Sequence, residues 1–568
     1  MTEEKVNGKQ LSHMFTEGAA LLDKHAKKVD ALNVFPVPDG DTGTNMNLTI
    51  SSGVKEVQAH LSDHAGEVAK HFSKGLLMGA RGNSGVILSQ LFRGFAKAVE
   101  KEKELNTKVL KKALEEGVNT AYKAVMKPVE GTILTVAKDA SQWSKKIPDD
   151  TSPADWLSKV VSNAKVSLEK TPQLLPVLKE VGVVDSGGQG LVYIYEGMLH
   201  ALEGRNTHQN EESALPDLED LVKVEHHQIS HAPLAPEDIT FGYCTEVMVK
   251  FDHEKANHLF DENVFREELS EHGDSLLVVS DDDLIKIHIH AEYPGNVLSK
   301  AQKYGSLIHV KVDNMREQHE ALHREQNEAE VSTTPLQEET DRNSEREEVR
   351  ADFGFVTVSM GKGIEELFKS LGASEVIEGG QTMNPSTEDI IHSIEKVNAR
   401  HIFVLPNNGN IIMAAEQAAE VSGSHVYIVP TSSVPQGISA LFAFDETGSA
   451  EDNLQAMKEA KEQVKTGQLT YAVRDTSIDG IEIKEGDYMG IAEKEIVASG
   501  QDITDVAKTL LQKLIDEETE IVTLIRGEEG NEETEQFMVT FIESIDDEVE
   551  VEVHQGGQPL YPFIISVE

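Results

Sequence analysis

The spacing of apolar residues changes along this 568-residue chain, and that change limits the folds open to it. From about residue 8 to 202 apolar residues such as Leu11, Phe15 and Leu22 recur every three to four positions, as in amphipathic helices. From Phe241 apolar and polar residues alternate, as in strands. A chain of this length is also too long for one hydrophobic core. We therefore predict three or four domains, of which the first is all-helical.

Two polar segments separate the regions. Residues 203–234 are turn-rich and contain prolines, which predicts a linker. Residues 324–350 are rich in acidic side chains and almost free of apolar ones. Such a segment cannot bury enough surface to offset the entropy of ordering, so we predict a disordered acidic tether. The boundaries that follow are 1–202 for the helical domain, 235–323 for a small α+β middle domain and 351–568 for a C-terminal domain.

The C-terminal region alternates strands and helices. Strand-like runs at Phe353–Ser359, Ile402–Leu405 and Val426–Val429 are separated by helical stretches, which favours an α/β sheet. The loops Thr382–Ser386 and Asn407–Asn410 lie at element ends, where such sheets bind ligands. After residue 469 we expect an added β-rich segment of hairpins around one helix, residues 503–514.

Composition excludes several classes of function. The chain has 99 acidic and 52 basic residues, a formal charge of −47, which argues against a general surface for nucleic acid or anionic lipid. No apolar run approaches the ~18 residues of a membrane-spanning helix. The single cysteine, Cys244, excludes an intrachain disulfide framework. We expect a cytoplasmic protein, not an integral membrane protein, that forms a homo-oligomer.

The segment Asn33–Met46 places Asp39 and Asp41 two residues apart on a glycine turn. A hard cation such as Mg²⁺ is held by one or two carboxylates together with substrate phosphates, so this pattern indicates metal-bridged nucleotide chemistry. The alternative is an ordinary solvated turn, because Asp and Gly dominate turns. A calcium-binding EF-hand is excluded, because Thr44 and Ile50 occupy its obligatory glycine and glutamate positions.

A second segment, Gly75–Gln90, carries four glycines with Asn83 and Ser84 before an apolar run. This pattern indicates a loop that leads into a helix, whose free amides suit phosphate. It is not a Walker loop, since no Gly-Lys-Ser/Thr follows at the required spacing. The alternative is close helix packing at the glycines. A third loop, Val184–Leu191, again combines a carboxylate, Asp185, with glycines before an apolar helix.

These three segments, together with Lys127–Ile133, resemble the ATP-binding subunit of bacterial fatty acid kinase. Its N-terminal domain is in turn similar to the ATP-binding subunit of dihydroxyacetone kinase. The resemblance implies an all-α helical barrel that binds ATP and two Mg²⁺ ions at one end. It extends at lower specificity to the later regions, and it suggests that the C-terminal unit docks a partner.

The resemblance and the residue chemistry together assign roles. Asp39 and Asp41 would hold Mg²⁺, and Arg81 would offset developing negative charge during catalysis. Asn33 or Asp30 would replace a third metal-binding aspartate that the family pattern has and this chain lacks. The residues expected to contact the nucleotide, or to support that contact, are Thr42, Thr44, Asn45, Gly82, Asn83, Ser84, Gly85, Thr132 and Asp185.

The acceptor is the second part of the hypothesis. No general base stands out near these loops, and a carboxylic acid with a pKa near ~4 is already ionised at neutral pH. With only 5% aromatic residues the chain lacks an obvious pocket for an acyl chain, so we expect a separate fatty-acid-binding protein as partner. The product would be an acyl phosphate for phospholipid synthesis. The alternatives are a dihydroxyacetone-like small-molecule (glycerone) kinase and a non-enzymatic ATP-dependent regulatory protein.

A separate metal site is expected in the middle domain. His288 and His290 alternate on one strand, so both imidazoles share a face, and Cys244 opens the preceding strand-like run. Thiolate and imidazole suit Zn²⁺. The fourth ligand would be water, Glu246 or His309. The alternative is two surface histidines and a small buried thiol. The resemblance favours zinc with a structural or partner-sensing role.

Overall fold

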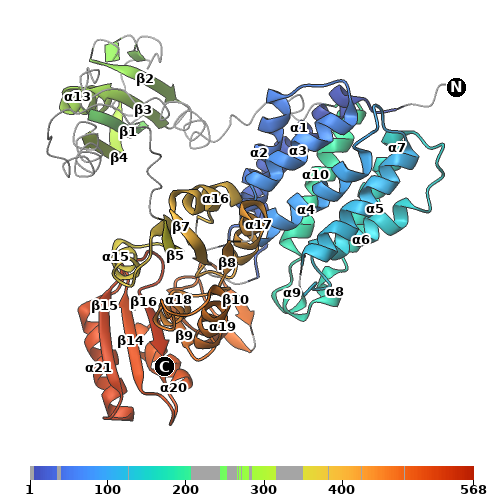
Figure 1. The fold of residues 1–568 in the computed structure, drawn as a ribbon. Coiled ribbons are helices and arrows are strands. Elements are labelled where there is room, and N and C mark those ends of the chain that lie inside the picture. The colour runs from blue at the N-terminus through green and yellow to red at the C-terminus, as the bar shows by residue number, and fades with distance from the viewer. Residues whose placement is uncertain are drawn as a thin grey trace, which may run out of the picture. The chain divides into compact units, whose positions relative to one another are not determined.

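A computed structural model gives the fold in two compact units, Met1–Asn210 with Glu347–Glu568, and Glu211–Arg346 (Figure 1). The residues that the structure describes are 5–34, 40–125, 127–205, 243–251, 265–266, 268–269, 272–280, 284–314, 350–380, 383–423, 425–478 and 480–568. The predicted linker and acidic tether therefore lie almost wholly outside the described residues. Each unit is described by itself.

The N-terminal part of the first unit is all-helical, as predicted (Figure 1). Its helices are α1 Gly8–Asp30, α2 Thr42–Ala59, α3 Ala65–Met78, α4 Gly82–Val99, α5 Thr107–Ala124, α6 Ile133–Ser144, α7 Pro153–Leu168, α8 Thr171–Leu174, α9 Pro176–Val181 and α10 Ser186–Leu202. Within the described residues, no helix of the molecule is both long and apolar enough to span a membrane.

Local sequence accounts for the helix starts, and aromatic packing for the core. Asn7 begins α1 with a capping box, in which its side chain accepts from the Gln10 amide while Gln10 accepts from the Asn7 amide. Phe15 of α1 stacks on Phe72 of α3 with ring centroids 3.8 Å apart, and Phe92 of α4 meets both rings edge-on. These buried rings join the apolar faces of three helices in one core.

Gly197 lets α10 lie directly against α1. A Cβ atom at this position would be 2.2 Å from the backbone oxygen of Glu17. We expect Gly197→Ala to destabilise the helical region by about 1–3 kcal/mol, the usual cost of forcing a methyl group into a packed core. Urea unfolding followed by circular dichroism measures this change.

The matched control is Ala201→Gly, which alters one methyl group on the same helix and should cost at most about 1 kcal/mol through helix propensity. An unchanged unfolding midpoint in Gly197→Ala would show that the two helices are not in this close contact.

The second unit contains an antiparallel sheet in the order β2-β3-β1-β4 and a short helix, α13 Pro294–Ala301, which contributes Val297 and Ala301 to the apolar core. Its strands are β1 Tyr243–Phe251, β2 Gly273–Ser280, β3 Leu284–Ala291 and β4 Gly305–Asn314. Val247, Ile287 and Ile289 are fully buried, as the alternating pattern predicts for one face of a sheet.

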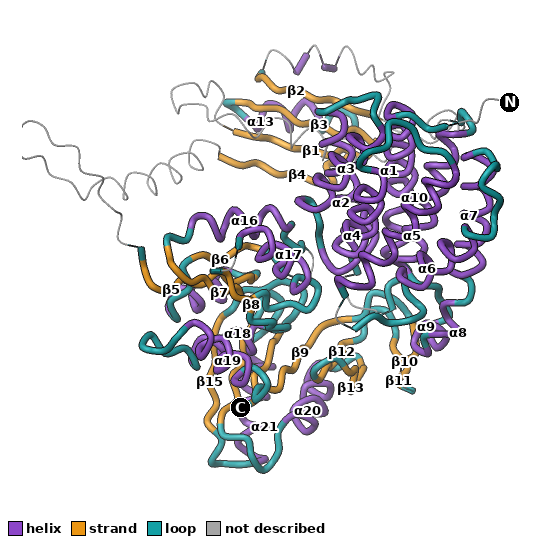
Figure 2. The backbone as a smooth tube through the Cα atoms, turned by 45° about the vertical axis from the view of Figure 1, so that its right-hand side comes forward, coloured by secondary structure: helices purple, strands orange, loops and turns teal. Residues whose placement is uncertain are grey.

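The C-terminal part of the first unit contains two larger sheets (Figure 2). The first is parallel, in the order β6-β5-β7-β8, and is interleaved with helices as predicted. Its elements are β5 Ala351–Ser359, α15 Lys362–Ser370, β6 Glu375–Glu378, α16 Thr387–Lys396, β7 Ala399–Leu405, α17 Ile412–Ser422, β8 Val426–Ile428, α18 Val434–Phe442 and α19 Ala450–Ala460.

The last segment differs from the expected hairpins around one helix. Its main sheet is six-stranded, in the order β13-β12-β9-β16-β14-β15, and β14 pairs with β15 in parallel. A second helix, α21, makes that parallel crossover, because parallel neighbours cannot be joined by a tight turn. The elements are β9 Lys465–Tyr471, β10 Thr476–Ile478, β11 Ile481–Ile483, β12 Tyr488–Ala492, β13 Glu495–Gly500, α20 Ile503–Leu514, β14 Ile521–Arg526, α21 Glu532–Ile545, β15 Glu550–Gln555 and β16 Phe563–Val567.

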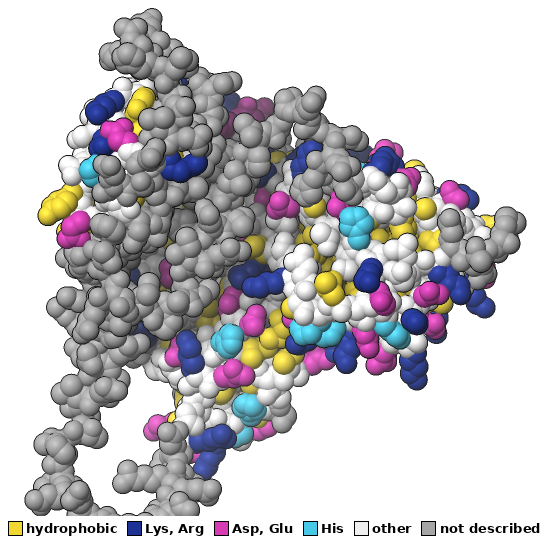
Figure 3. Space-filling view, turned by 90° about the horizontal axis from the view of Figure 1, so that it is seen from above, with side chains coloured by type: hydrophobic (Ala, Val, Ile, Leu, Met, Phe, Trp, Pro, Cys, Tyr) yellow, Lys and Arg dark blue, Asp and Glu magenta, His cyan; other side chains and the backbone are white. Residues whose placement is uncertain are grey.

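The described surface mixes charges of both signs. Figure 3 shows Lys and Arg side chains interspersed with Asp and Glu over the face it displays. The described residues on this face therefore present no general basic surface to polyanions.

Candidate functional site

A cavity of about 360 Å³ lies in the first unit, and both parts of that unit line it. Six of the residues selected from sequence line its N-terminal side: Asn33, Asp41, Thr42, Asn45, Asn83 and Ser84. The other side is made by polar residues of the C-terminal part, among them Asn408, Asn410, Ser433, Thr466, Gln468, Glu493 and Lys494. Asp39 lies outside the described residues.

The N-terminus of α2 exposes Asp41 to this cavity because another carboxylate caps the helix. Asp41 occupies the N-cap position but makes no side-chain cap bond. Instead Asp30 accepts from the Gly43 amide at 2.6 Å and from the Thr44 hydroxyl at 2.8 Å. Burial raises the pKa of Asp30 above its usual value. Thr44 is therefore engaged with Asp30 and does not line the cavity.

Asn33 lies over the start of α2. Its Oδ1 accepts from the Thr42 hydroxyl at 2.6 Å and from the Ser186 hydroxyl at 3.3 Å. Its Nδ2 is buried and has no hydrogen-bond partner among the described residues. Of the two candidates for the missing third metal ligand, Asn33 lines the cavity and Asp30 does not.

Helix α4 begins at the same cavity. Asn83 and Ser84 lie in its first turn, and no side chain caps its free amides. Gly82 has φ +58°, and a Cβ atom there would be 2.6 Å from the Asn45 amide nitrogen, so a side chain is excluded. Two helix N-termini, those of α2 and α4, thus open onto one cavity. The uncapped amides and the dipole of α4 favour an anion there, whereas the first amides of α2 already donate to Asp30.

The other glycines of this segment serve packing. Gly75 lies inside α3 and Gly79 ends it, so the predicted loop is shorter than expected. A Cβ atom at Gly75 would be 2.6 Å from the Ser52 backbone oxygen, and one at Gly85 would be 2.4 Å from the Thr49 hydroxyl oxygen. The alternative interpretation, close helix packing, is therefore correct for these positions.

Arg81 faces the C-terminal part and does not line the cavity. Its guanidinium donates to the backbone oxygen of Asn384 at 2.7 Å and lies 3.3 Å from the Asp389 carboxylate. The side chain of Asn384 in turn donates to the Asp41 carboxylate. Arg81 thus joins the two parts of the unit through this hydrogen bond and this ion pair.

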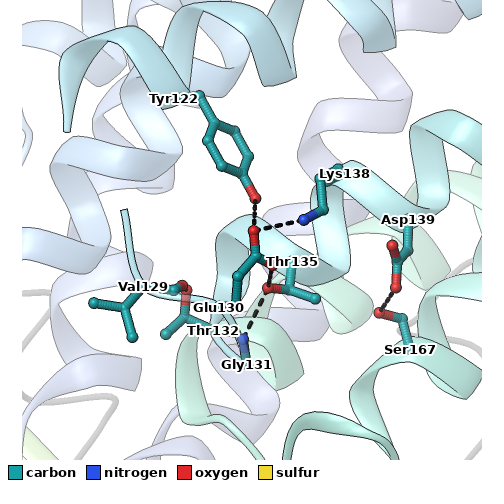
Figure 4. Close-up of polar contacts among 9 residues, drawn as sticks. All are labelled: Tyr122, Val129, Glu130, Gly131, Thr132, Thr135, Lys138, Asp139 and Ser167. Atoms are coloured by element: carbon teal, nitrogen blue, oxygen red, sulfur yellow. Dashed lines mark hydrogen bonds and ion pairs between the residues drawn. The ribbon is translucent and has the colours of Figure 1, made fainter. Parts of the chain in front are cut away.

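The segment Lys127–Ile133 forms a hydrogen-bonded turn around Glu130 (Figure 4). The Glu130 carboxylate accepts from Lys138 at 2.6 Å, from Thr135 at 2.6 Å and from Tyr122 at 3.3 Å. Thr132 is the N-cap residue of α6 and donates its hydroxyl to the Val129 backbone oxygen. These bonds give Glu130 and Thr132 local partners, and neither residue lines the cavity.

Asp185 joins the starts of two helices. It caps α10 by accepting from the Gly188 amide at 2.7 Å, and it also accepts from the Ile133 amide at the start of α6. Burial raises the pKa of Asp185 to about 6. The residue is next to Ser186, which binds Asn33, so it supports the wall of the cavity without lining it.

The raised pKa of Asp185 predicts a pH dependence of stability. Between pH 3.8, its ordinary pKa, and about pH 6, the folded protein binds a proton that the unfolded chain releases. The contribution of Asp185 to the free energy of unfolding therefore falls as pH rises through that window. A difference of one in pKa between the folded and unfolded states corresponds to about 1.4 kcal/mol of stability. Asp185→Asn cannot titrate, so the wild type should lose thermal stability relative to this variant as pH rises from 4 to 6.

Thermal midpoints of both proteins over that range test the point, with Asp150→Asn as an exposed control. A wild-type-minus-variant difference that does not change with pH would mean that Asp185 titrates normally.

Sequence reasoning missed how much the C-terminal part contributes. The Arg474 guanidinium donates to the backbone oxygens of Ala31, Asn33 and Val34, the last at 3.1 Å, and so holds the segment before Asp41. Burial lowers its pKa. The only sequence signal was the choice of Thr382–Ser386 and Asn407–Asn410 as ligand loops, which contain Asn384 and the cavity residues Asn408 and Asn410.

The predicted zinc ligands are tested only at the level of the backbone. The strand register pairs Cys244 with His290 and Glu246 with His288, while His309 pairs with Met248. Directly paired residues share a face of an antiparallel sheet. The side chains of Cys244, His288, His290 and His309 lie outside the described part of the structure.

A different group of metal-type side chains lies on α2 and α3. Glu56, His60 and His71 place their ligand atoms within 4.8 Å of one another, and the two imidazole rings stack. Lys74 pairs with the Glu56 carboxylate at 3.2 Å. This group is remote in sequence from the predicted zinc ligands.

Comparison with known proteins covers the whole chain. The DAK2 domain model matches residues 36–200, and the models of the FakA-like (fatty acid kinase) middle and C-terminal domains match 240–322 and 354–568. Protein YloV of Bacillus subtilis (strain 168) is 52% identical over 569 residues, which is 100% of each chain.

Two solved structures are similar to parts of the chain. Dihydroxyacetone kinase from C. freundii in complex with AMP-PNP and Mg²⁺ is 17% identical over 35% of each chain, with a TM-score of 0.28. The fatty acid kinase B3 protein of Streptococcus pneumoniae, loaded with linoleic acid, is 11% identical over 38% of this chain and 99% of its own, with a TM-score of 0.28.

Proposed function

Because this chain belongs to the FakA-like family of fatty acid kinase proteins, we propose that it transfers the γ-phosphoryl group of ATP to the carboxylate of a fatty acid. The acid would be presented by a separate fatty-acid-binding protein, and the product would be an acyl phosphate. The observation that carries this proposal is the convergence of Asp41, at the start of α2, and of the uncapped N-terminus of α4 on one polar cavity.

The donor set of the cavity fits a magnesium nucleotide. Two amide oxygens, those of Asn83 and Asn384, have no hydrogen-bond partner among the described residues, and both lie near Asp41 or in the cavity wall. Oxygen ligands of this kind are what Mg²⁺ prefers. The unpartnered Asn33 amide nitrogen is a donor and suits a phosphate oxygen.

Each residue has a defined task in this proposal. Asp41 and Asp39 would hold the metal, and bound Mg²⁺ would neutralise charge on the phosphates. Asn33, whose amide oxygen already accepts from Thr42 and Ser186, would donate its amide nitrogen to a phosphate oxygen. The Ser84 hydroxyl and the free amides of Gly82, Asn83 and Ser84 would donate to phosphate oxygens from the positive end of α4, whereas the Gly85 amide already donates to the Arg81 backbone oxygen. Asn45 and Thr42 would complete the polar wall, and Asp185 would keep α6 and α10 in place around it.

The position of Arg81 changes the role that we propose for it. Since its guanidinium binds Asn384 and Asp389, we propose that Arg81 acts by holding the C-terminal part over the cavity. Lys494, which lines the cavity, is the cation we propose near the transferred phosphoryl group.

The central test is the production of acyl phosphate by the full chain with ATP, Mg²⁺ and a fatty-acid-loaded carrier protein, trapped as a hydroxamate. Asp41→Asn should lower the rate by about 10²–10³-fold, because it removes a charge that holds the metal against the phosphates. Asp63→Asn, an exposed aspartate elsewhere in the helical region, should leave the rate unchanged.

Acyl phosphate formation at the wild-type rate in Asp41→Asn would refute the metal assignment. Phosphorylation of dihydroxyacetone without any carrier protein would instead favour the small-molecule kinase. ATP binding without transfer to either acceptor would favour the regulatory protein.

We also propose a Zn²⁺ ion bound by Cys244, His288 and His290. The pairing of Cys244 with His290 on adjacent strands supports this set, because directly paired residues share a sheet face. Elemental analysis of the purified full chain should give about one zinc per chain, and His290→Ala should lose it. The matched control is His13→Ala, which changes an exposed histidine on α1, outside the candidate ligand set. Equal zinc in the wild type and in His290→Ala would exclude this ligand set.

A further inference from the structure

Asn384 lies at the point where the C-terminal part meets the site. It stands just before α16, and its side chain is buried, with 1% exposed. Its backbone oxygen accepts from Arg81, and its amide nitrogen donates to Asp41. Asn384 therefore contacts two of the charged side chains selected from sequence, Asp41 before α2 and Arg81 before α4.

The side-chain oxygen of Asn384 has no hydrogen-bond partner among the described residues. A buried polar atom without a partner costs about 1–3 kcal/mol, so such an atom usually has a ligand in the working state of a protein. The nearby Asp41 carboxylate indicates which charge a ligand of this oxygen would carry. Beside the Asp41 carboxylate, an amide oxygen is suited to a cation and not to an anion.

The two ends of an amide group offer opposite chemistry. Its nitrogen donates to a bare carboxylate, whereas its oxygen coordinates a hard cation, and a half-turn about the last side-chain bond exchanges them. The amide can therefore satisfy Asp41 when no cation is bound and share the cation with Asp41 when one is present.

We infer that Asn384 supplies its amide oxygen to the divalent cation held by Asp41, so that the C-terminal part completes the metal site of the helical part. This inference rests on the proposed function, since it assumes that Mg²⁺ binds at Asp41 with the nucleotide. It makes the C-terminal part a contributor to nucleotide binding in addition to any docking role.

Contacts between the helical part and the C-terminal part fix the position of Asn384. Ala80 and Val86 of the helical part are buried in one apolar core with Ile390 and Ala414 of the C-terminal part. The Thr387 amide donates to the Ala80 backbone oxygen at 3.1 Å, three residues after Asn384. A backbone bond on one side and the Arg81 contact on the other fix the loop that carries Asn384.

The test is calorimetric titration of Mg²⁺ into the full chain with a non-hydrolysable ATP analogue. Asn384→Ala should weaken Mg²⁺ binding by about 10–100-fold, as expected for loss of a metal-supporting group. Asn384→Asp retains an oxygen ligand and should bind Mg²⁺ at least as tightly as the wild type. The control is Arg93→Ala, which removes an exposed ion pair with Glu420 between the same two parts and should leave Mg²⁺ affinity unchanged.

Thermal midpoints give a second readout that packing alone would not produce. Without Mg²⁺, Asn384→Asp places two carboxylates together and should lower the midpoint. With Mg²⁺ and the nucleotide analogue, the same variant should show a larger rise in midpoint than the wild type, because the cation relieves that repulsion.

Three outcomes would overturn the inference. Mg²⁺ affinity within twofold of the wild type in Asn384→Ala would remove the ligand role, and a tighter affinity would show that Asn384 blocks the site. A weakened affinity in Asn384→Asp equal to that of Asn384→Ala would show that only the amide donor matters. If the wild type binds Mg²⁺ and Asp41→Asn does not, these outcomes leave the proposed function standing; if the wild type itself does not bind, both fail.

Discussion

The close packing of α2 against α3 and α4 is the constraint on which the site depends. Gly75, Gly79 and Gly85 lie so near to Ser52 and Thr49 of α2 that a single added carbon would collide. Because α2 begins at Thr42 and α4 at Gly82, this packing brings the two helix N-termini to the same cavity. These glycines do not line the cavity, but the close packing that they permit places the starts of α2 and α4 beside it.

Sequence reasoning predicted the parts of the molecule that local patterns determine. The helical N-terminal region and the parallel C-terminal sheet follow from periodicity, and Asp41, Asn83 and Ser84 were selected from a turn and a glycine-rich segment. It failed where one pattern has two physical causes. Gly75 was assigned to a phosphate loop, yet it lies within α3, since a glycine that permits close packing and one that permits a loop look alike in sequence.

The contribution of the C-terminal part could not be predicted because no local signal marks it. Asn384 is 343 positions from Asp41, and it reaches the site only because Ala80 and Val86 share an apolar core with α16 and α17. Arg81 illustrates the same limit. A cation beside a phosphate-type loop suggested a catalytic charge, and only its hydrogen bond to Asn384 and its ion pair with Asp389 indicate a bridging role. The parallel pairing of β14 with β15 in the final β-rich segment was also missed, since strand-like runs in the sequence do not show which strands pair or in which direction.

Arg474 grips the segment before Asp41 through main-chain oxygens alone. These hydrogen bonds do not depend on the side chains at positions 31, 33 and 34, so they fix the path of the main chain while the Asn33 side chain serves the cavity wall. Arg474 also couples the two parts of the unit, because any displacement of its side chain would move the main chain at residues 31–34 with it. A partner that displaces the C-terminal part would thus shift the cavity wall at Asn33 without contacting the cavity itself.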